Sequence, residues 1–420
     1  MKKFVHILFI ISAFCLMYSC GGDDDAPIPV AEVDEENPTA PANLTATLSD
    51  ETSIDLAWDA ATDNEGVTSY TVFQDGVMAQ ENITGTSTTV ANLTAETSYN
   101  FYVVAFDAAG NQSDPSTSID ASTALTFKTL LSEMGVFTAI NDNITPASGV
   151  QLYEINSTLF TDYAKKQRLI RLPEGTTMTS NGTDLLPDFP DNTLIAKTFY
   201  YNIDDRTPSL GKQVIETRIF LKIAGQWQVG DYIWNEAQNE ATYTTNGSQK
   251  PISYIDENGD TQAVDYIIPS QQDCFTCHNN NGTTLPIGLK LRSLNFVPSY
   301  ANQNQLDFFI SQGILENVSS ESVSVLPDWT NDTDFTLDER ARAYIDVNCA
   351  HCHQPGGSIE SFGLDFRYET PFEDTGIYAN RGEIQFRFDS TLPTYRMPQL
   401  GRTIIHEEAL EMLVEYIDAL

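Results

Sequence analysis

The chain has 420 residues and a formal net charge of −37, with 59 acidic residues against 22 Lys and Arg. A chain this acidic repels nucleic acid and anionic lipid, which excludes nucleic acid as an expected partner. The length suffices for about two to four domains. Six cysteines are too few for a disulfide network, so the fold must depend on buried apolar surface.

The N-terminus, MKKFVHILFIISAFCLMYSC, carries two lysines, an apolar run over residues 4–17, and Ser19 directly before Cys20. This pattern is typical of a secretory signal and is too short to span a membrane as a helix. A cysteine in this place resembles the lipidation site of bacterial lipoproteins. We therefore predict a lipoprotein signal peptide over residues 1–19 and a lipid on Cys20 that anchors the protein to the outer membrane of the cell envelope. An ordinary signal with an incidental cysteine is the alternative.

Residues 20–41 are rich in Asp, Glu and Pro and contain almost no large apolar side chain. Such a segment cannot bury enough surface to fold, so we expect a disordered acidic tether. The Asp run after Cys20 resembles the export signal of some surface-exposed lipoproteins, and a generic spacer explains it nearly as well. The sequence thus leaves open whether the protein faces the periplasm or the outside.

Residues 42–124 contain short alternating segments between turn signals: LTATLS, SIDLAWD, SYTVFQDG, TSTTVANL and SYNFYVVAFD. Strands of this length and spacing predict an all-β sandwich. Three features resemble a fibronectin type III domain: Trp58 in the second strand, the run LTAETSY with Tyr99 at the tyrosine-corner position, and the turn DAAGNQS. The resemblance implies a fold and says little about function.

Residues 125–269 predict a second, β-rich domain. VIETRIFLKI alternates with period two, AGQ offers a turn, and WQVGDYIW returns, which predicts a hairpin. The aromatic residues Trp227, Trp234, Tyr200 and Tyr201 either line a ligand surface or form a core, which is the more frequent outcome. This region has no cysteine and no histidine, so it cannot by itself supply the usual metal ligands.

Cys15 lies in the predicted signal peptide and Cys20 is the predicted lipidation site, so four cysteines remain. They form two pairs of the form Cys-x-x-Cys-His, in DCFTCHN and NCAHCHQ. This spacing is the attachment signature of c-type haem. On a helix, positions i, i+3 and i+4 share one face, so two thiols bind the porphyrin vinyl groups while the imidazole reaches iron. We therefore predict two covalently bound haem c groups. The attachment thiols are Cys274, Cys277, Cys349 and Cys352, and the proximal iron ligands are His278 and His353.

A zinc ribbon and a redox dithiol are the alternatives for these cysteines. The interval between Cys277 and Cys349 far exceeds the usual gap of a ribbon, and each pair ends in histidine. A redox dithiol needs no following histidine and is expected near a βαβ pattern. In the second motif we assign the iron ligand to His353 because it follows the second thiol, whereas His351 lies between the two thiols.

A capping box at Thr336 and Glu339 opens a predicted helix that leads into the second motif. HEEALEMLVEYIDAL predicts a terminal helix. With the motif between them, these helices make residues 334–420 resemble the class I cytochrome c fold. In that family a Met followed by Pro supplies the distal ligand, so the resemblance implies Met397 for the second haem.

The first haem segment, residues 270–333, offers no such partner, because neither Met nor His occurs between His278 and Cys349. The sixth iron position there is either filled from a distance or open. The candidates are His351, His406, Met134 and Met178. The two histidines are preferred because they have no other assigned role.

The segments LLSEMGVF, LYEINSTLFTDYAKKQRLIRLPEG, DYIWNE, CFTCHNNNG and IGLKLRSLN, with the terminal module, resemble a family of exported two-haem c-type cytochromes. The resemblance implies electron transfer with redox partner proteins or other cytochromes. We expect a multidomain electron carrier: a fibronectin type III sandwich, a β-rich middle domain and a mostly α, cytochrome c-like C-terminal region. A peroxidase- or oxidase-like enzyme with one open haem, and a binding or adhesion module, stay open as alternatives.

Overall fold

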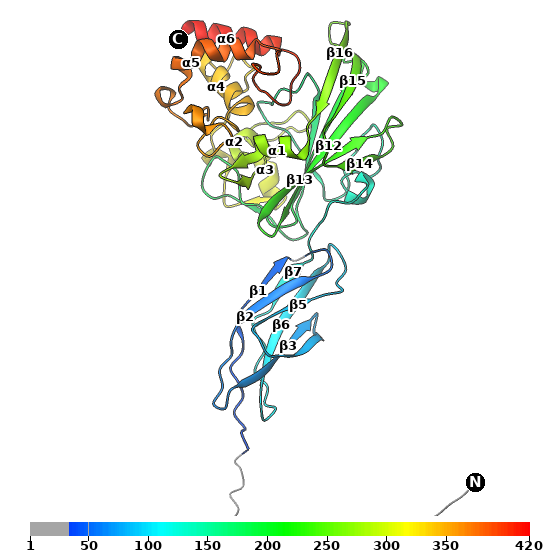
Figure 1. Cartoon of the computed structure of the whole chain (residues 1–420), viewed down its shortest axis with the longest axis vertical. Coiled ribbons are helices and arrows are strands. Elements are labelled where there is room, and N and C mark those ends of the chain that lie inside the picture. Colours follow the sequence, from blue (N-terminus) through cyan, green and yellow to red (C-terminus); the bar gives the residue numbers. More distant parts are fainter. Residues whose placement is uncertain (1–32, 49) are drawn as a thin grey trace, which may run out of the picture.

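The computed structural model describes residues 33–48 and 50–420. A narrow N-terminal domain leads into a larger body, in which the C-terminal helices lie beside a twisted sheet (Figure 1). The predicted signal peptide over residues 1–19 and the lipidation site Cys20 lie outside the described residues. No helix of the described part combines the length and apolarity needed to cross a bilayer.

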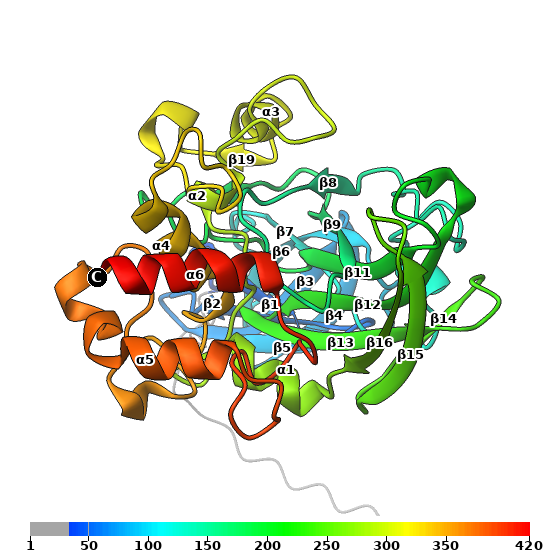
Figure 2. The same ribbon diagram turned by 90° about the horizontal axis from the view of Figure 1, so that it is seen from above.

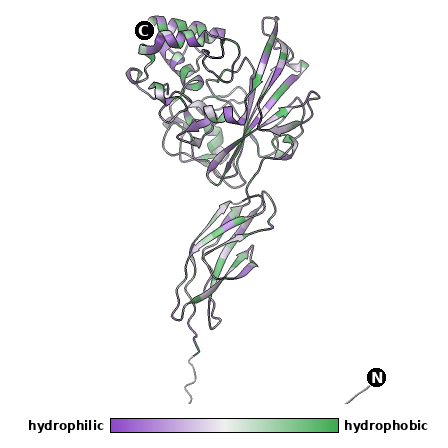
Figure 3. Ribbon diagram, in the orientation of Figure 1, coloured by the Kyte–Doolittle hydropathy of each residue, from purple (hydrophilic) through white to green (hydrophobic). Residues whose placement is uncertain are grey.

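The N-terminal domain is a sandwich of two antiparallel sheets, in the orders β1-β2-β5 and β4-β3-β6-β7. Its strands are β1 (Ala42–Leu48), β2 (Ile54–Asp59), β3 (Val67–Gln74), β4 (Val77–Ile83), β5 (Ser87–Val90), β6 (Ser98–Asp107) and β7 (Ile119–Ser122). Hydropathy alternates along these strands (Figure 3), and the inward side chains form a core around Trp58 and Phe101. The Tyr99 hydroxyl accepts a hydrogen bond from the Thr94 amide at 2.7 Å. The predicted sandwich and its tyrosine corner are therefore confirmed.

The end of the predicted tether lies against this sandwich. The Thr39 amide donates to the Thr62 carbonyl at 2.9 Å, and the Asn111 side chain donates to the Asp34 carbonyl at 3.0 Å. Residues 34–41 therefore run along the domain, although they form no strand or helix.

The middle region contains a six-stranded antiparallel sheet in the order β14-β13-β12-β11-β9-β8. Its strands are β8 (Gln151–Tyr153), β9 (Lys165–Arg171), β11 (Leu194–Asn202), β12 (Lys212–Ile223), β13 (Gln226–Trp234) and β14 (Ala241–Thr244). β12 and β13 form the predicted hairpin, with left-handed φ values of 48° at Ala224 and 75° at Gly225 in the turn. A further hairpin, β15 (Ser248–Ile255) and β16 (Thr261–Ile268), packs against the sheet. The β-rich middle region is thus confirmed.

Each face of the six-stranded sheet buries a different core. Leu169, Ala196 and Ile219 belong to the core on one face, and their neighbours Ile170 and Phe220 point to the other. This is the period of two that the sequence of β12 predicts. Among the aromatic residues singled out from the sequence, Trp227, Trp234 and Tyr201 are buried, which confirms the core interpretation for these three.

The segment that carries the first motif packs on this second face. It contains α1 (Gln271–His278), β17 (Asn279–Asn280), β18 (Thr283–Thr284), α2 (Leu291–Leu294), α3 (Gln305–Ser311) and β19 (Leu315–Glu316), which pairs with β10 (Met178–Thr179). Leu291 and Phe309 are fully buried in the same cluster as Ile170 and Phe220. One core therefore joins the first motif segment to the sheet.

The C-terminal region is partly helical, with α4 (Leu337–Asn348), α5 (Ile377–Phe388) and α6 (Glu407–Ala419). The predicted capping box forms, since the Glu339 carboxylate accepts from the Thr336 amide at 2.9 Å. Seen from above, α6 lies between α4 and α5 (Figure 2). Tyr344, Leu413 and Ile417 are buried where these helices pack.

A buried ion cluster joins α4 to the first motif segment. The Asp346 carboxylate accepts from Lys290 Nζ at 3.0 Å and from Arg292 Nη2 at 3.1 Å. Burial opposes ionisation, but Lys290 and Arg292 together keep the pKa of Asp346 below its ordinary value. The cluster therefore holds the two motif-bearing regions in one arrangement.

Replacing Asp346 by Ala removes the carboxylate that Lys290 and Arg292 share and leaves Arg292 with Glu369 as its remaining carboxylate partner. The free energy of unfolding should fall by about 1–3 kcal/mol at neutral pH. Because the pKa is depressed in the folded state, this stabilisation is present above the unfolded value of about 3.9 and is lost as pH falls through the folded value. Urea unfolding followed by circular dichroism at pH 7 and at progressively lower pH checks both. The exposed Asp418→Ala serves as control, and an Asp346→Ala effect no larger than the control would contradict the role of the cluster.

Candidate functional site

The first motif lies on a short helix that begins directly after the β15–β16 hairpin. The Ser270 hydroxyl accepts from the Asp273 amide, and the Asp273 carboxylate accepts from the Ser270 amide, which starts α1. Cys274, Cys277 and His278 follow on this helix, as the spacing predicts. His278 Nδ1 contacts the Leu285 carbonyl at 2.8 Å. This contact orients the ring and leaves Nε2 available to bind a metal.

The second motif forms the turn that follows α4. The His353 amide donates to the Cys349 carbonyl at 3.1 Å, so this segment keeps one helical hydrogen bond beyond the end of α4. The His353 carbonyl accepts from the Phe366 amide at 2.9 Å, and the two rings lie 4.9 Å apart. Nδ1 of His353 is buried and has no hydrogen-bond partner among the described residues.

The two motifs, far apart in the sequence, meet in the structure. The Asn281 amide donates to the Gly356 carbonyl at 2.8 Å, and the Asn280 side chain donates to the Pro355 carbonyl at 3.0 Å. The Cys352 thiol also lies 3.6 Å from the Thr276 carbonyl. The loop after each motif thus binds the other motif's segment.

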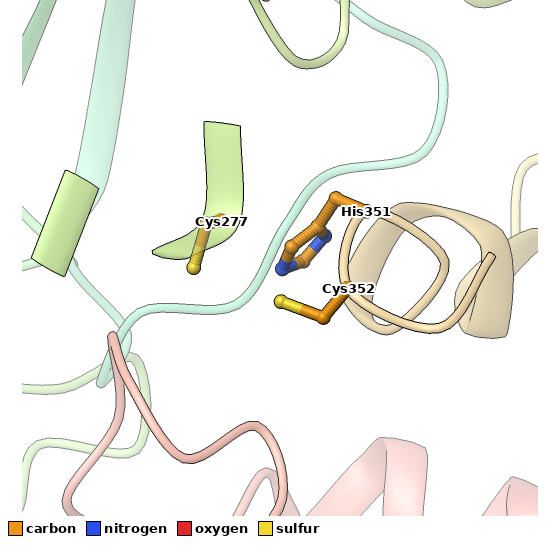
Figure 4. A group of neighbouring side chains, drawn as sticks. All are labelled: Cys277, His351 and Cys352. Atoms are coloured by element: carbon orange, nitrogen blue, oxygen red, sulfur yellow. The ribbon is translucent and has the colours of Figure 1, made fainter. Parts of the chain in front are cut away.

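The contact brings together three of the side chains singled out from the sequence. The ligand atoms of Cys277, His351 and Cys352 all lie within 4.8 Å of one another (Figure 4). Cys274 and Cys349 stand outside this group, and all four cysteines of the described part are free. The arrangement is therefore not the four-thiolate set of a zinc ribbon, although one thiol from each motif and one imidazole are ligand types that zinc accepts.

Burial sets the protonation of two imidazoles and two thiols of the motifs. It lowers the pKa of His278 to about 3 and of His353 to about 4, so both imidazoles are neutral and keep a lone pair at physiological pH. Burial raises the pKa of the Cys274 thiol to about 11 and of Cys349 to about 12. Both motifs therefore offer a neutral imidazole suited to iron.

A cavity of about 400 Å³ lies beside the second motif. Cys349, Cys352 and His353 line it together with Met397, and apolar side chains such as Ile345 form much of the rest. The structure thus places Met397 at the same cavity as the predicted proximal ligand. An apolar cavity with two convergent ligand types is the kind of space that a cofactor occupies.

Arg402 holds the loop that carries Met397. Its buried guanidinium donates to the carbonyls of Met397 at 3.1 Å and Phe388 at 2.8 Å, and the Met397 amide donates to the Arg387 carbonyl at 3.0 Å. The end of α5 and the Met397 loop are therefore fixed by one side chain. No sequence pattern pointed to Arg402, because the carbonyls that it binds come together only in the fold.

A second, smaller cavity of about 100 Å³ lies beside the first motif. Cys274, Cys277 and His278 line it from α1, and Arg168, Lys197 and Arg218 line it from the six-stranded sheet. The two cavities adjoin, since His351 and Pro398 line both. Its two thiols and neutral imidazole are the donor set that a haem c requires, and this cavity is smaller than the one beside the second motif.

The three cavity-lining cations Arg168, Lys197 and Arg218 were not singled out from the sequence. The strand KKQRLIR contained a usable signal, because period two places Lys166 and Arg168 on the same face as the buried Ile170. Inward positions of a strand are usually apolar, so two cations at such positions indicate a role beyond the packing of the sheet.

The remaining candidates for the first sixth position lie elsewhere. His406 stacks on Phe160 with ring centroids 4.1 Å apart and is hydrogen-bonded to the Tyr344 hydroxyl at 2.9 Å. Met134 and Met178 are buried in the two cores of the middle region. His351 alone of the four lines the cavity of the first motif.

Comparison with known proteins concerns the N-terminal domain. Residues 39–122 match the family model of the fibronectin type III domain. Chitinase A1 of Niallia circulans is 47% identical over 91 residues, which cover 22% of this chain and 13% of the chitinase. Chitinase Chi52 of Paenibacillus xylanexedens is 44% identical over 107 residues, covering 25% of this chain and 19% of the chitinase. The chain thus spans less than a fifth of these relatives, and what is shared is a domain found in bacterial glycoside hydrolases.

Solved structures give short matches. A family 28 exopolygalacturonase of Yersinia enterocolitica is 27% identical, with a TM-score of 0.20, and the match covers 25% of this chain and 24% of that chain. An Fn3-like protein from Clostridium thermocellum is 24% identical, with a TM-score of 0.19, and the match covers 22% of this chain and all of that protein. At these TM-scores neither match bears on residues 125–420, and the two-haem assignment stays a prediction.

A substitution at Gly357 tests whether the second motif forms the tight turn described above. A Cβ built there would lie 2.4 Å from the Cys352 carbonyl oxygen, so Gly357→Ala should force the turn open and destabilise the protein by about 1–3 kcal/mol. Gly382 in α5 has open space at the Cβ position, so the control Gly382→Ala should stabilise by about 0.5–1 kcal/mol. Thermal unfolding of the two variants checks the contrast. Equal behaviour would contradict the described turn.

Proposed function

We propose that the protein is a two-haem c-type cytochrome that relays electrons at the bacterial cell envelope. A haem c at each motif would supply an iron centre that exchanges one electron at a time. Cys274 and Cys277 would hold one group and Cys349 and Cys352 the other. The neutral His278 and His353 imidazoles are suited to the proximal iron positions.

The meeting of the two motifs carries this proposal. The Cys277 and Cys352 sulfurs, one attachment point from each motif, lie within 4.8 Å of each other. If the two motifs had unrelated structural roles, their second thiols would not be expected to lie side by side. Side-by-side attachment suits passage of an electron from one site to the other within a single protein.

Different distal ligands would give the two sites different potentials. Met397 lines the cavity of His353, and His/Met ligation raises the potential of haem iron. His351 lines the cavity of His278, and its Nδ1 is buried without a hydrogen-bond partner in the described part of the chain. We assign His351 to the sixth position of the first haem, which makes the first site the electron donor to the second.

The C-terminal region supports the class I cytochrome c comparison in outline, because α4 leads into the motif and α6 packs on α4. The remaining assignments follow from the sequence. Lipidation of Cys20 would anchor the protein to the outer membrane, and redox partner proteins or other cytochromes would exchange electrons with it. The acidic surface argues against nucleic acid.

A haem enzyme of peroxidase or oxidase type is the second candidate. The observation that favours it is the absence of a Met or His in the sequence between His278 and Cys349. In that case the first iron keeps an open position for a substrate, and the second site supplies electrons to it.

The mature protein should carry two covalent haem groups. Cys274→Ser with Cys277→Ser, and Cys349→Ser with Cys352→Ser, should each remove one group, because each pair holds its own porphyrin. Intact-protein mass and a haem-stained denaturing gel measure this directly. A mature chain with no added macrocycle, but with one bound zinc that both double variants lose, would contradict the proposal and favour a metal site at Cys277, His351 and Cys352.

Removal of each assigned distal ligand should change one haem. His351→Ala should convert the first haem, and Met397→Ala the second, from low-spin to high-spin in the optical and electron paramagnetic resonance spectra of the ferric protein. His406→Phe and Met412→Leu, which change side chains outside the cavities, serve as matched controls. A wild-type protein that already contains a high-spin haem that binds cyanide would favour the enzyme.

A further inference from the structure

Three cations form a row across neighbouring strands of the six-stranded sheet. Arg168 on β9 lies opposite Lys197 on β11, and Lys197 lies opposite Arg218 on β12. Residues opposite one another in paired strands point to the same face. All three side chains line the cavity that borders the first motif.

Only one member of the row has a carboxylate partner. Arg218 Nε donates to the buried Glu216 carboxylate at 3.0 Å. Arg168 is only 7% exposed, and its Nη2 has no hydrogen-bond partner among residues 33–48 and 50–420. The Lys197 ammonium lies over the Phe199 ring, 5.0 Å from the centroid, and forms no ion pair within the same residues.

Other acidic groups lie near the row without forming an ion pair to Arg168 or Lys197. The charge of Glu154 acts on Arg168, but its carboxylate accepts from the Ser299 amide and hydroxyl. Asp231 lies opposite Arg218 in the sheet, but burial and the neighbouring Glu216 raise its pKa well above the ordinary value, which disfavours its charged form. Asp273, on the α1 wall of the cavity, is engaged by the Ser270 hydroxyl and amide. Two cations on the cavity wall are left without an anion.

A buried cation such as Arg168 and a half-buried one such as Lys197 are costly without a partner. Moving a charge out of water carries a penalty of several kcal/mol even after relaxation. Burial, with repulsion from Arg168, lowers the pKa of Lys197 well below its usual range. In a chain with 59 acidic residues, two cations gathered without a carboxylate indicate an anion that enters the cavity from outside the chain.

We propose that Arg168 and Lys197 bind the two propionate carboxylates of the haem attached to Cys274 and Cys277, an inference that rests on the proposed function. The number of charges on the cavity wall matches, because a haem carries two carboxylates and two cavity-lining cations remain once Arg218 is paired with Glu216. The chemistry matches too, since a guanidinium and an ammonium are the usual carboxylate partners. α1 would hold the vinyl edge of the group by its thiols, and the sheet wall would hold the opposite, charged edge.

With these contacts, the middle region would take part in holding the first haem. The six-stranded sheet contains no cysteine or histidine, yet it would form one wall of the first haem site and neutralise its charge. It also accounts for the inward Arg168 of KKQRLIR, which a purely structural sheet would replace with an apolar residue.

The test uses the purified mature protein with Arg168→Gln and Lys197→Gln. Each should shift the propionate bending modes in the resonance Raman spectrum and lower the reduction potential of the first haem, because lost positive charge disfavours the reduced iron. The potential of the second haem should stay unchanged and reports correct folding. Lys165→Gln removes the same charge from the same strand on its other face, where Lys165 is partly exposed, and should change neither signal.

Conservative variants distinguish the effect of losing a positive charge from the effect of changing the packing of the side chain. Arg168→Lys and Lys197→Arg keep the cations and should retain the wild-type Raman modes more closely than the glutamine variants. Glutamine variants that bind both haems yet match Lys165→Gln in both signals would overturn the inference. A protein without haem would instead refute the proposed function.

The same cations could take a small carboxylate or oxyanion from solution, and a titration distinguishes that source. Sulfate and acetate added to the wild-type protein should produce no saturable change in the spectrum or potential of the first haem, because the propionates already occupy the cations. A saturable change that Arg168→Gln abolishes would overturn the propionate assignment and identify the wall as a site for a free anion.

Discussion

The contact between the loops that follow the two motifs is the constraint on which the rest of the structure depends. A backbone hydrogen bond joins Asn281 to Gly356. At Gly356 a side chain would collide with Asn281, since a Cβ there would lie 2.5 Å from its Nδ2. The close approach sets Cys277 beside Cys352, and it makes the two cavities adjoin along His351 and Pro398.

Other interactions hold the same regions of the chain together. The buried Asp346 holds α4 to the segment after the first motif through Lys290 and Arg292. The core on one face of the middle sheet extends into the same segment. Together these interactions make a single body from regions that the sequence pattern separates at residues 269 and 333, and they fix the positions of both motifs relative to the sheet.

Local patterns predicted the local structure well. The sandwich strands, the β12–β13 hairpin, the capping box at Thr336 and the terminal helix all follow from periodicity or capping chemistry, which act over a few residues. The spacing of the cysteines and histidines likewise identifies the motifs without a fold. These features are encoded within one turn of chain or one strand.

Long-range features could not be predicted in this way. Nothing in the sequence indicates that Cys277 lies beside Cys352, that Arg402 holds the Met397 loop, or that Arg168 and Lys197 border the first motif. Each depends on the packing of elements that are distant in the chain, and α5 was not expected at all. The sequence offered four candidates for the sixth position of the proposed first haem, and of these His351 lines the cavity beside the first motif.

The circular dichroism spectrum of the oxidised, mature protein in the haem absorption band tests the central claim most directly. Two haems attached through neighbouring sulfurs should couple and give a signal of paired positive and negative lobes, which disappears in either single-haem variant. A wild-type spectrum equal to the sum of the two single-haem variants, or one without any haem absorption, would contradict two adjacent haem sites.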